Sequence, residues 1–405
     1  MGITGLWPIL DPISQRVDFA EYCLKYGFLP KYLSTRVFQL GVDASVLLDG
    51  YSAGSITYSR YQHHTTVDSS LTQLFTILCQ LSYAPVHCTF VYDGDERPSH
   101  KRGTRVITAQ PLLYKKSKAA VKAFGFDVVD ARGDAEAELA VMNQKGIVDA
   151  ILTRDGDVFP LGAQCILKVV SKECTDLKLT VDVYYADVIE EELKLTQGGL
   201  ILYSLLAGND VDKGGVDGIG PITALALAQS GLGNSLIADC RPLNSLQRHR
   251  YLTNLKIKLS DEVKHNTHGC LRVREPACAQ KLLTSDLPSD NALNWFLSPP
   301  TSWSGSDSAR TFEITPRIHY LPGIAAFCTT HIGWSPEVTL TRCHEKLWRG
   351  VIIRILCSPL LFYSKADGRL LAPDSRKAFL IDKQGRPFPY TNTTTLQGCN
   401  PRTLP

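Results

Sequence analysis

Seven acidic residues lie at or just beyond the ends of short apolar segments in the first 210 residues. They are Asp43, Asp93, Asp134, Glu136, Asp155, Asp157 and Asp210. Brought to one edge of a sheet without cations, their carboxylates would repel one another and raise one another's pKa. Carboxylate oxygens in this number suit Mg²⁺ or Mn²⁺, which also bind phosphate oxygens. Two such ions about 4 Å apart activate a water and stabilise the leaving oxygen of a phosphodiester, so the sequence predicts a two-metal site.

Four of these acids stand close together in the stretch DAEAELAVMNQKGIVDAILTRDGD. Residues two apart on a helix do not share a face, so Asp134 and Glu136 can point the same way only if Asp134 is the N-cap. Asp155 and Asp157 follow a strand, where Gly156 allows an extended or unusual turn. Each acid alone could be a simple cap or turn residue, but the ordered set of seven favours a shared site.

The acids must be positioned by the strands that precede them. VFQLGVD ends at Asp43, VHCTFVYD at Asp93 and IVDAILTRD at Asp155, and helix-like segments at 70–82 and 114–124 lie between them. This alternation predicts an α/β fold with a mostly parallel sheet flanked by helices. In such sheets, ligands bind at the carboxyl ends of the strands, where these acids are expected.

The second half of the chain predicts helices joined by short turns. A buried helix at 199–206 ends at AGND, and the GIG that follows predicts a tight hairpin before a helix that starts at Pro221. Residues 284–310, rich in Pro and Ser, predict a linker or a loop that wraps the core. Apolar segments at 311–358 predict a small helical tail, and the last thirty residues are expected to be poorly ordered.

Composition excludes some classes of protein. The chain has 405 residues, is 44% hydrophobic and carries 43 basic and 40 acidic residues, a net charge of +3 that argues neither for nor against a polyanionic partner. Twelve cysteines without a CxxC pattern favour reduced intracellular thiols. The longest nearly uncharged apolar segment, Leu200–Gly208, is far shorter than the ~20 residues of a membrane span, so a soluble protein without a membrane partner is expected.

One segment carries only basic charge. From residue 97 to 122 there is no acid, and the basic residues are Arg97, Lys101, Arg102, Arg105, Lys115, Lys116, Lys118 and Lys122. Such a segment beside Asp93 predicts contacts with nucleic-acid phosphates. The alternative is the solvated face of an amphipathic helix, above all for the later lysines. The hairpin from Gly218 to Gly220 offers amides at a helix N-terminus for another phosphate, or is only a structural turn.

Together these motifs resemble the XPG-type structure-specific nucleases, the superfamily of flap endonucleases. The resemblance is clear up to about residue 230 and is closest to the Holliday-junction-resolving branch, with its fungal-type XPG-I proteins. It rests on MGITGLWPIL, GVDAS, FVYDG, GDAEAELA, TRDGDVFPLGA and LLAGNDVDKGGVDGIGP. It implies a PIN-like nuclease core with a helix-two-turn-helix and a small helical C-terminal region.

The resemblance also implies functional residues. The seven acids would be catalytic ligands of two Mg²⁺ ions, Lys101 and Arg105 of a helical arch would position the scissile phosphate, and the hairpin would hold a monovalent cation such as K⁺. DNA contacts would come from Gly2, Lys101, Arg102, Arg105, Lys115, Lys116, Gly218 and Gly220. Two departures stand out: Asp134 replaces the usual Glu, and Ile222 and Thr223 replace basic residues after GIGP, so phosphate contacts there would rest on backbone amides.

The implied organisation has five parts. They are an N-terminal region at 1–110, an internal region at 111–198, the helix-two-turn-helix region at 199–285, a linker at 286–318 and a C-terminal helical region with a tail at 319–405.

The expected protein is a nuclear, Mg²⁺-dependent endonuclease that cuts branched double-stranded DNA in repair or recombination. Because 134 minus 93, or 41 positions, separate the second and third acids, the arch has room for one loop and one helix, which favours an open arch. A 5′-flap endonuclease or exonuclease of replication repair, and a catalytically silent nucleic-acid-binding scaffold, remain as alternatives. A monomer and a dimer formed on a junction both stay open.

Overall fold

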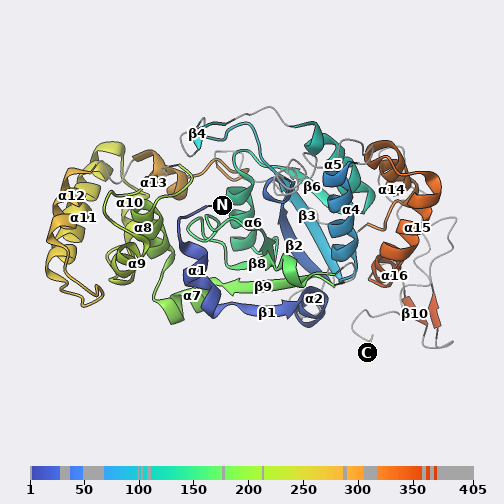
Figure 1. Ribbon diagram of the computed structural model, residues 1–405, viewed down its shortest axis with the longest axis horizontal. Coiled ribbons are helices and arrows are strands. Elements are labelled where there is room, and N and C mark those ends of the chain that lie inside the picture. The colour runs from blue at the N-terminus through green and yellow to red at the C-terminus, as the bar shows by residue number, and fades with distance from the viewer. Residues whose placement is uncertain are drawn as a thin grey trace.

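The protein is built on one mixed sheet with helices on both faces and a helical lobe at each end (Figure 1). The computed structural model describes residues 2–27, 37–48, 68–98, 100–101, 104–106, 111–175, 178–211, 214–285, 290–304, 317–357, 362–364 and 369–371.

The sheet has the strand order β1-β9-β8-β7-β2-β3-β6. Its pairings from β8 to β6 are all parallel, and β9 pairs antiparallel with both β8 and β1. The mostly parallel sheet predicted from the sequence is therefore confirmed. The strand bounds are β1 Gln15–Asp18, β2 Phe38–Asp43, β3 Val86–Tyr92, β6 Asp127–Asp130, β7 Ala150–Leu152, β8 Cys165–Val169 and β9 Thr180–Tyr185.

The central strands β2 and β3 are buried along their whole length. This agrees with their largely apolar sequences, which are typical of parallel strands covered by helices on both faces. Leu40 and Val42 of β2 face the core on one side of the sheet. Gly41 faces the other side, where a Cβ atom would lie 2.5 Å from Leu139 Cδ2. The missing side chain lets the helix that carries Leu139 pack directly against the centre of the sheet.

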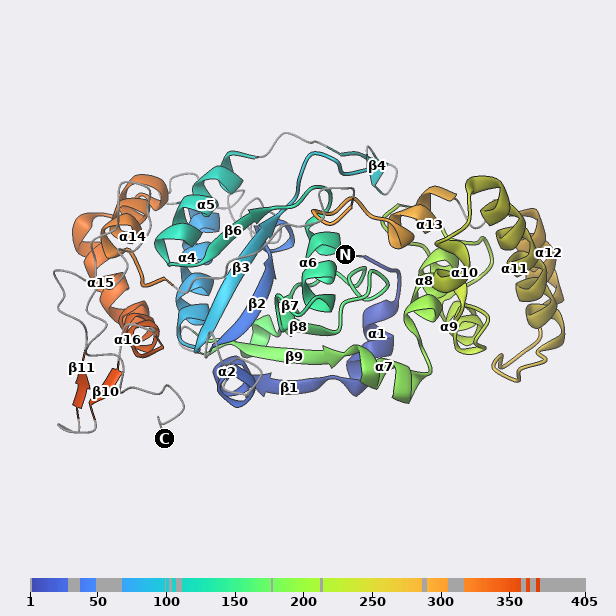
Figure 2. The ribbon, with the colours of Figure 1, turned by 180° about the vertical axis from the view of Figure 1, so that it is seen from behind.

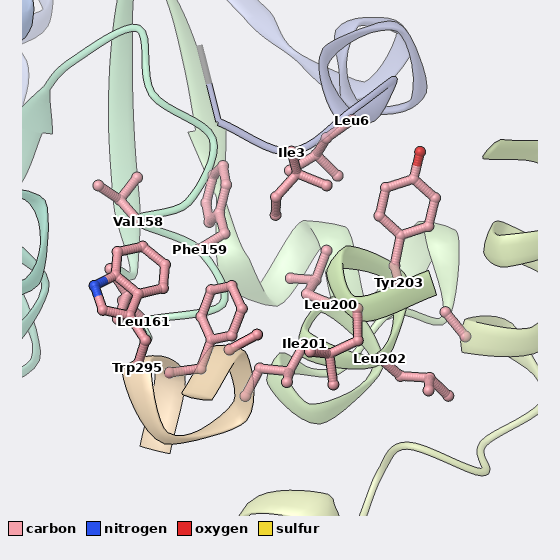
Figure 3. Packing of buried hydrophobic residues seen from close by; sticks show 14 of the residues in the cluster. Ile3, Leu6, Val158, Phe159, Leu161, Leu200, Ile201, Leu202, Tyr203 and Trp295 are labelled. Atoms are coloured by element: carbon pink, nitrogen blue, oxygen red, sulfur yellow. The ribbon is translucent and has the colours of Figure 1, made fainter. Parts of the chain in front are cut away.

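Helices cover both faces of the sheet. One face packs against α2 (Phe19–Gly27), α4 (Ser69–Ser82) and α5 (Leu112–Ala123), which confirms the helices predicted near 70–82 and 114–124. The other packs against α1 (Leu6–Leu10), α6 (Ala135–Gln144) and α8 (Gln197–Ala207). In this second core, Ile3, Phe159, Leu200 and Trp295 meet from four separate segments (Figure 3).

The lobe beside α8 contains the predicted helix-hairpin-helix. Pro221 is the first residue of α9 and Gly220 is its N-cap, as expected from the sequence. The remaining helices of this part are α7 (Ala186–Leu193), α9 (Pro221–Gln229), α10 (Leu236–Cys240), α11 (Ser245–His265), α12 (Pro276–Thr284) and α13 (Asp290–Leu297).

The segment predicted as a linker or a loop that wraps the core contains a helix and lies against the core. It contains α13, in which Trp295, Phe296 and Leu297 are buried in the core. The apolar stretch NALNWFL is short and stands among Pro and Ser residues, so the composition of the whole segment concealed a short amphipathic helix.

A second lobe covers the opposite end of the sheet (Figure 2). It consists of α14 (Leu321–Phe327), a π-helical turn (Cys328–Ile332), α15 (Pro336–Lys346) and α16 (Trp348–Leu356), and α14 and α16 pack on α5 and α4. The predicted small helical tail is thus present, while the expectation for the last thirty residues lies outside the described residues. Short elements complete the chain: η1 Asp11–Ile13, η3 Ser171–Glu173, β4 His100–Lys101 with β5 Thr104–Arg105, and β10 Phe362–Ser364 with β11 Arg369–Leu371.

Two predictions from composition can be compared with the structure. Every cysteine in the described part of the chain is a free thiol. Among the same residues, no helix combines the length and the apolar character that crossing a bilayer would need.

Candidate metal centre and nucleic-acid interface

The predicted acids lie around the carboxyl ends of adjacent parallel strands. Asp43 is the last residue of β2 and pairs with Val91 of β3, and Asp93 follows β3 directly. The others are placed by the elements that follow: Asp134 and Glu136 at the start of α6, Asp155 and Asp157 after β7, and Asp210 after α8. The parallel order of the strands therefore gathers acids that are up to 167 positions apart (210 minus 43) in the sequence.

The carboxylates form one cluster. Asp155, Asp157 and Asp210 each offer an oxygen within 4.8 Å of the other two. Repulsion by Asp93 and Asp155 acts on Asp43, and repulsion by Asp155, Asp134 and Asp157 acts on Glu136, so these groups lie within electrostatic reach. The structure thus brings all seven predicted acids together, and their role as metal ligands stays a prediction.

Asp93 and α6 are joined by hydrogen bonds between two loops. The amide of Gly94 donates to the carbonyl of Gly133 at 2.8 Å, and the amide of Ala135 donates to Asp93 Oδ1 at 3.0 Å. Asp134 is the N-cap of α6, as predicted, but its side chain makes no capping hydrogen bond. Since Asp93 accepts a first-turn amide, the Asp134 carboxylate is available for other contacts.

Burial and mutual repulsion raise the pKa of three of these acids. Burial raises the pKa of Asp43 to about 8, and repulsion by Asp93 adds to this, although the Val46 amide and the Thr153 hydroxyl donate to the carboxylate. Burial also raises the pKa of Glu136 well above its ordinary value, and burial with repulsion by Asp210 raises that of Asp155. Carboxylates this close and this buried fit divalent cations, which would restore their ionised state.

Lys101 of β4 supplies one positive charge to the cluster. Its Nζ lies 2.8 Å from Asp134 Oδ1 and 3.0 Å from Glu136 Oε1. Burial lowers the pKa of Lys101, but attraction by Glu136 and Asp134 outweighs burial and holds that pKa well above its ordinary value. The predicted arch residue therefore contacts two of the predicted ligands directly.

The other basic residues of the segment 97–122, here called the arch segment, lie in different places. Arg97 donates to Asp93 Oδ2 at 3.0 Å, and Arg105 is exposed on β5. Lys115 and Lys116 lie on α5, toward the C-terminal lobe and apart from β4 (Figure 1). The structure does not bring these two lysines to Lys101, and Arg102 lies outside the described residues.

The N-terminal segment covers the DGD turn. Gly2 has φ +84°, and a Cβ atom there would lie 2.2 Å from Asp155 Oδ1, so only glycine fits. Trp7 Nε1 donates to the carbonyl of Arg154 at 3.1 Å. Gly156 does not have a positive φ, which is compatible with the extended form of the turn. Its small size also makes room for Leu6, whose Cδ2 would lie 3.1 Å from a Cβ.

The two-glycine hairpin packs against α12. Gly218 has φ +86°, and its carbonyl accepts a hydrogen bond from the Cys278 thiol at 3.2 Å. Lys281 Nζ lies 3.3 Å from Asp217 Oδ2. The positively charged side chain of Lys281 thus lies beside this hairpin. The sequence had predicted that only backbone amides would contact a phosphate there. No local pattern could have revealed this side chain, because Lys281 lies 64 positions further along the chain.

Trp295 is the other residue that the sequence did not single out. Its indole Nε1 donates to Asp134 Oδ2 at 3.0 Å. The only signal was an aromatic pair in NALNWFL, which the surrounding Pro and Ser residues obscured.

The sheet and its flanking helices have the fold of XPG-type nucleases. A family model described as XPG I-region matches residues 125–210, which contain five of the seven acids. The resemblance to the XPG and flap-endonuclease superfamily inferred from the motifs is confirmed.

Particular relatives agree with this class. The chain is 41% identical to "Flap endonuclease GEN-like 1" of Arabidopsis thaliana over 26% of this chain and 17% of the relative. It is 27% identical to the human "Flap endonuclease GEN homolog 1" over 58% of this chain and 26% of the relative. The chain therefore spans about a quarter or less of the length of these curated relatives.

A solved structure shares the fold. It is described as the Holliday junction-resolving enzyme GEN1 in complex with product DNA and Mg²⁺, and it superposes with a TM-score of 0.66 at 22% identity. The match covers 88% of this chain and 80% of the other, so it extends beyond the sheet to the helical lobes.

The raised pKa of Asp43 predicts a pH-dependent stability in EDTA. Its carboxyl ionises near 3.8 in the unfolded chain and near 8 in the folded one. Between these values the unfolded state has lost a proton that the folded state keeps, so the free energy of unfolding falls as pH rises, by at most about 1.4 kcal/mol per pH unit. An Asp43→Asn variant has no carboxyl at this position and therefore lacks this fall in the free energy of unfolding.

The variant should therefore gain stability relative to the unmodified chain as pH rises from 5 to about 8. Urea unfolding at several pH values measures the difference. If the difference in free energy of unfolding between the variant and the unmodified chain does not change with pH, the pKa of Asp43 is not raised.

Proposed function

We propose that this chain is the nuclease part of a Mg²⁺-dependent, structure-specific endonuclease that hydrolyses phosphodiesters in branched DNA. Flaps and four-way junctions are the substrates, and nuclear DNA repair or recombination is the setting. The observation that carries the proposal is the gathering of the predicted acids, most of them buried, around the carboxyl ends of adjacent parallel strands. The names of the relatives, flap endonucleases and a junction-resolving enzyme, agree with it.

The acids have separate parts in this proposal. Asp155, Asp157 and Asp210 would hold one divalent ion, and Asp43, Asp93 and Glu136 would hold the second. The oxygens of Asp134 face Trp295 and Lys101. Asp134 would therefore bind the second ion through a bridging water. Two bound Mg²⁺ ions would activate a water and offset charge on the leaving oxygen. Mn²⁺ suits the same ligands.

Basic groups and backbone amides would bind the phosphates around the scissile bond. Lys101 and the exposed Arg105 flank the acids from the β4–β5 hairpin, and Gly2 lies against Asp155. At the far lobe, the hairpin at Gly218–Gly220 would contact the duplex arm, with a monovalent cation such as K⁺ at its turn. These contacts read shape and backbone rather than base sequence.

One observation favours the silent-scaffold alternative. Lys101 already pairs with Asp134 and Glu136, so one of their two negative charges is offset without a metal ion. A scaffold would bind branched DNA with this surface and not cleave it. A 5′-flap endonuclease or exonuclease differs from the favoured function only in substrate and is separated by the same assay.

An Asp155→Asn variant tests the enzymatic proposal. It should bind labelled flap, fork and four-way-junction DNA as well as the unmodified chain does, but cleave it more slowly by on the order of 10²-fold or more, because one ligand loses its charge. The Asp187→Asn variant, changed at an exposed acid of α7, is the control.

EDTA should abolish cleavage by the unmodified chain, and Mg²⁺ should restore it. Junction binding without cleavage at any Mg²⁺ or Mn²⁺ concentration would establish the scaffold instead.

The short arch predicts cleavage without threading of a free end. Within the described residues, the arch segment contains one two-stranded hairpin and α5. A flap whose 5′ end is blocked by biotin and streptavidin should be cut within about twofold of the unblocked rate, because a strand can enter an open arch from the side. Loss of cleavage on blocking would show that threading is required.

Lys281 should contribute one phosphate contact of the duplex arm. A Lys281→Ala variant is expected to reduce the slope of log affinity against log salt concentration by about 1. Lys258→Ala, changed at an exposed lysine of α11, is the charge-matched control. It should reduce the slope less. Asp217→Asn should strengthen binding, since it removes the acid that pairs with Lys281. Equal slopes for both lysine variants would refute the contact.

A further inference from the structure

Residues 290–304, here called the strap, run from α13 across the N-terminal end of α6 (Figure 2). The amide of Ser302 donates to Glu138 Oε2 at 2.9 Å, and Arg132 donates to the carbonyl of Ser304. A Cβ atom at Gly133 would lie 2.7 Å from the carbonyl oxygen of Pro300. The strap is therefore fastened to α6 on both sides of Asp134, the residue at which that helix begins.

Trp295 is the strap residue that reaches the acidic cluster. Its side chain is buried, with 5% of its surface exposed, and its ring packs edge-on against Phe296 at a centroid distance of 4.8 Å. Its Nε1 donates to Asp134 Oδ2, and Lys101 Nζ lies 5.5 Å from the ring centroid. A single indole thus contacts both an acid of the cluster and the cation paired with it.

These contacts determine how Asp134 is oriented. A buried carboxylate is unfavourable unless donors satisfy its oxygens. One oxygen of Asp134 takes the indole N–H and the other faces Lys101, while Asp93, not Asp134, accepts the amide of Ala135. The orientation of Asp134 is therefore determined by side chains from two distant segments and not by its own helix.

The face of the indole also gives Lys101 a place to lie. A divalent ion held by Glu136 would repel the Lys101 ammonium, which now lies 3.0 Å from Glu136 Oε1. An aromatic face stabilises a nearby ammonium by about 0.5–2 kcal/mol when the pair is partly desolvated. Trp295 therefore favours keeping Lys101 near the cluster when it is displaced from the acids.

We propose that Trp295 is a positioning residue of the metal centre, which holds Asp134 through its indole N–H and supports Lys101 with its ring. The strap is then part of the centre and not a linker. The inference rests on the proposed function only in taking the acids as ligands of divalent ions, and it can be tested without DNA.

A Trp295→Phe variant of the full chain removes the N–H donor and keeps most of the packing. Calorimetric titration with Mn²⁺ should give a dissociation constant about tenfold or more above that of the unmodified chain, the usual range when a residue that orients a metal ligand is lost. Trp303→Phe makes the same change in the same strap, where the ring lies over Lys145. It should leave the constant unchanged.

A double-mutant cycle separates positioning from general stability. Because Trp295 acts through Asp134, its replacement in an Asp134→Asn background should weaken Mn²⁺ binding little further. Equal losses for Trp295→Phe and Trp303→Phe, or additive losses with Asp134→Asn, would overturn the proposal.

A measurement on the unmodified side chain covers the case in which Trp295→Phe does not fold. The indole N–H resonance of Trp295, assigned by Trp→Phe changes at the four other tryptophans, should shift as Mg²⁺ is added, while that of Trp303 stays in place. An unshifted Trp295 resonance at saturating Mg²⁺ would refute the contact. If the chain binds metal in this way yet cleaves no DNA, the proposed function fails and the role of Trp295 stands.

Discussion

Repulsion among buried carboxylates is the constraint on which the rest of this structure depends. Parallel strands bring Asp43 and Asp93 to the same edge, and Gly41 lets α6 pack so close to β2 that Glu136 joins them. Burial then penalises the charges of Asp43, Glu136 and Asp155. Much of the surrounding structure can be understood as a response to that penalty, from the amide of Ala135 on Asp93 to the ammonium of Lys101.

The sequence predicted best what local patterns encode. The strands that lead to Asp43 and Asp93 are largely apolar segments that end in an acid or are followed by one, and such segments are typical of central parallel strands. The helix-two-turn-helix was predictable because Gly218 and Pro221 have backbone requirements that show in the residue type. The seven acids were also singled out from the sequence and from its resemblance to a family, and their role as metal ligands stays a prediction.

The residues that escaped prediction depend on contacts between distant segments. Trp295 and Lys281 meet their partners across 161 and 64 positions of chain, and neither belongs to a recognisable pattern. Gly156 was noticed for its turn, but the contact that its small size allows with Leu6, 150 positions earlier in the chain (156 minus 6), could not be predicted. Lys115 and Lys116 share a basic segment with Lys101, yet α5 carries them away from β4.

The two lobes contact the rest of the protein in different ways. The C-terminal lobe is held by buried polar contacts: Arg354 donates to the carbonyl of Val86 at 2.9 Å, and His319 Nε2 lies 3.0 Å from Ser82 Oγ. The other lobe ends in the strap, which returns to the acids. A nascent chain has all seven carboxylates once residue 210 is made, but lacks the indole of Trp295 until about 85 further residues follow (295 minus 210). Completion of the acidic cluster therefore requires a late segment of the chain to fold back over an early one.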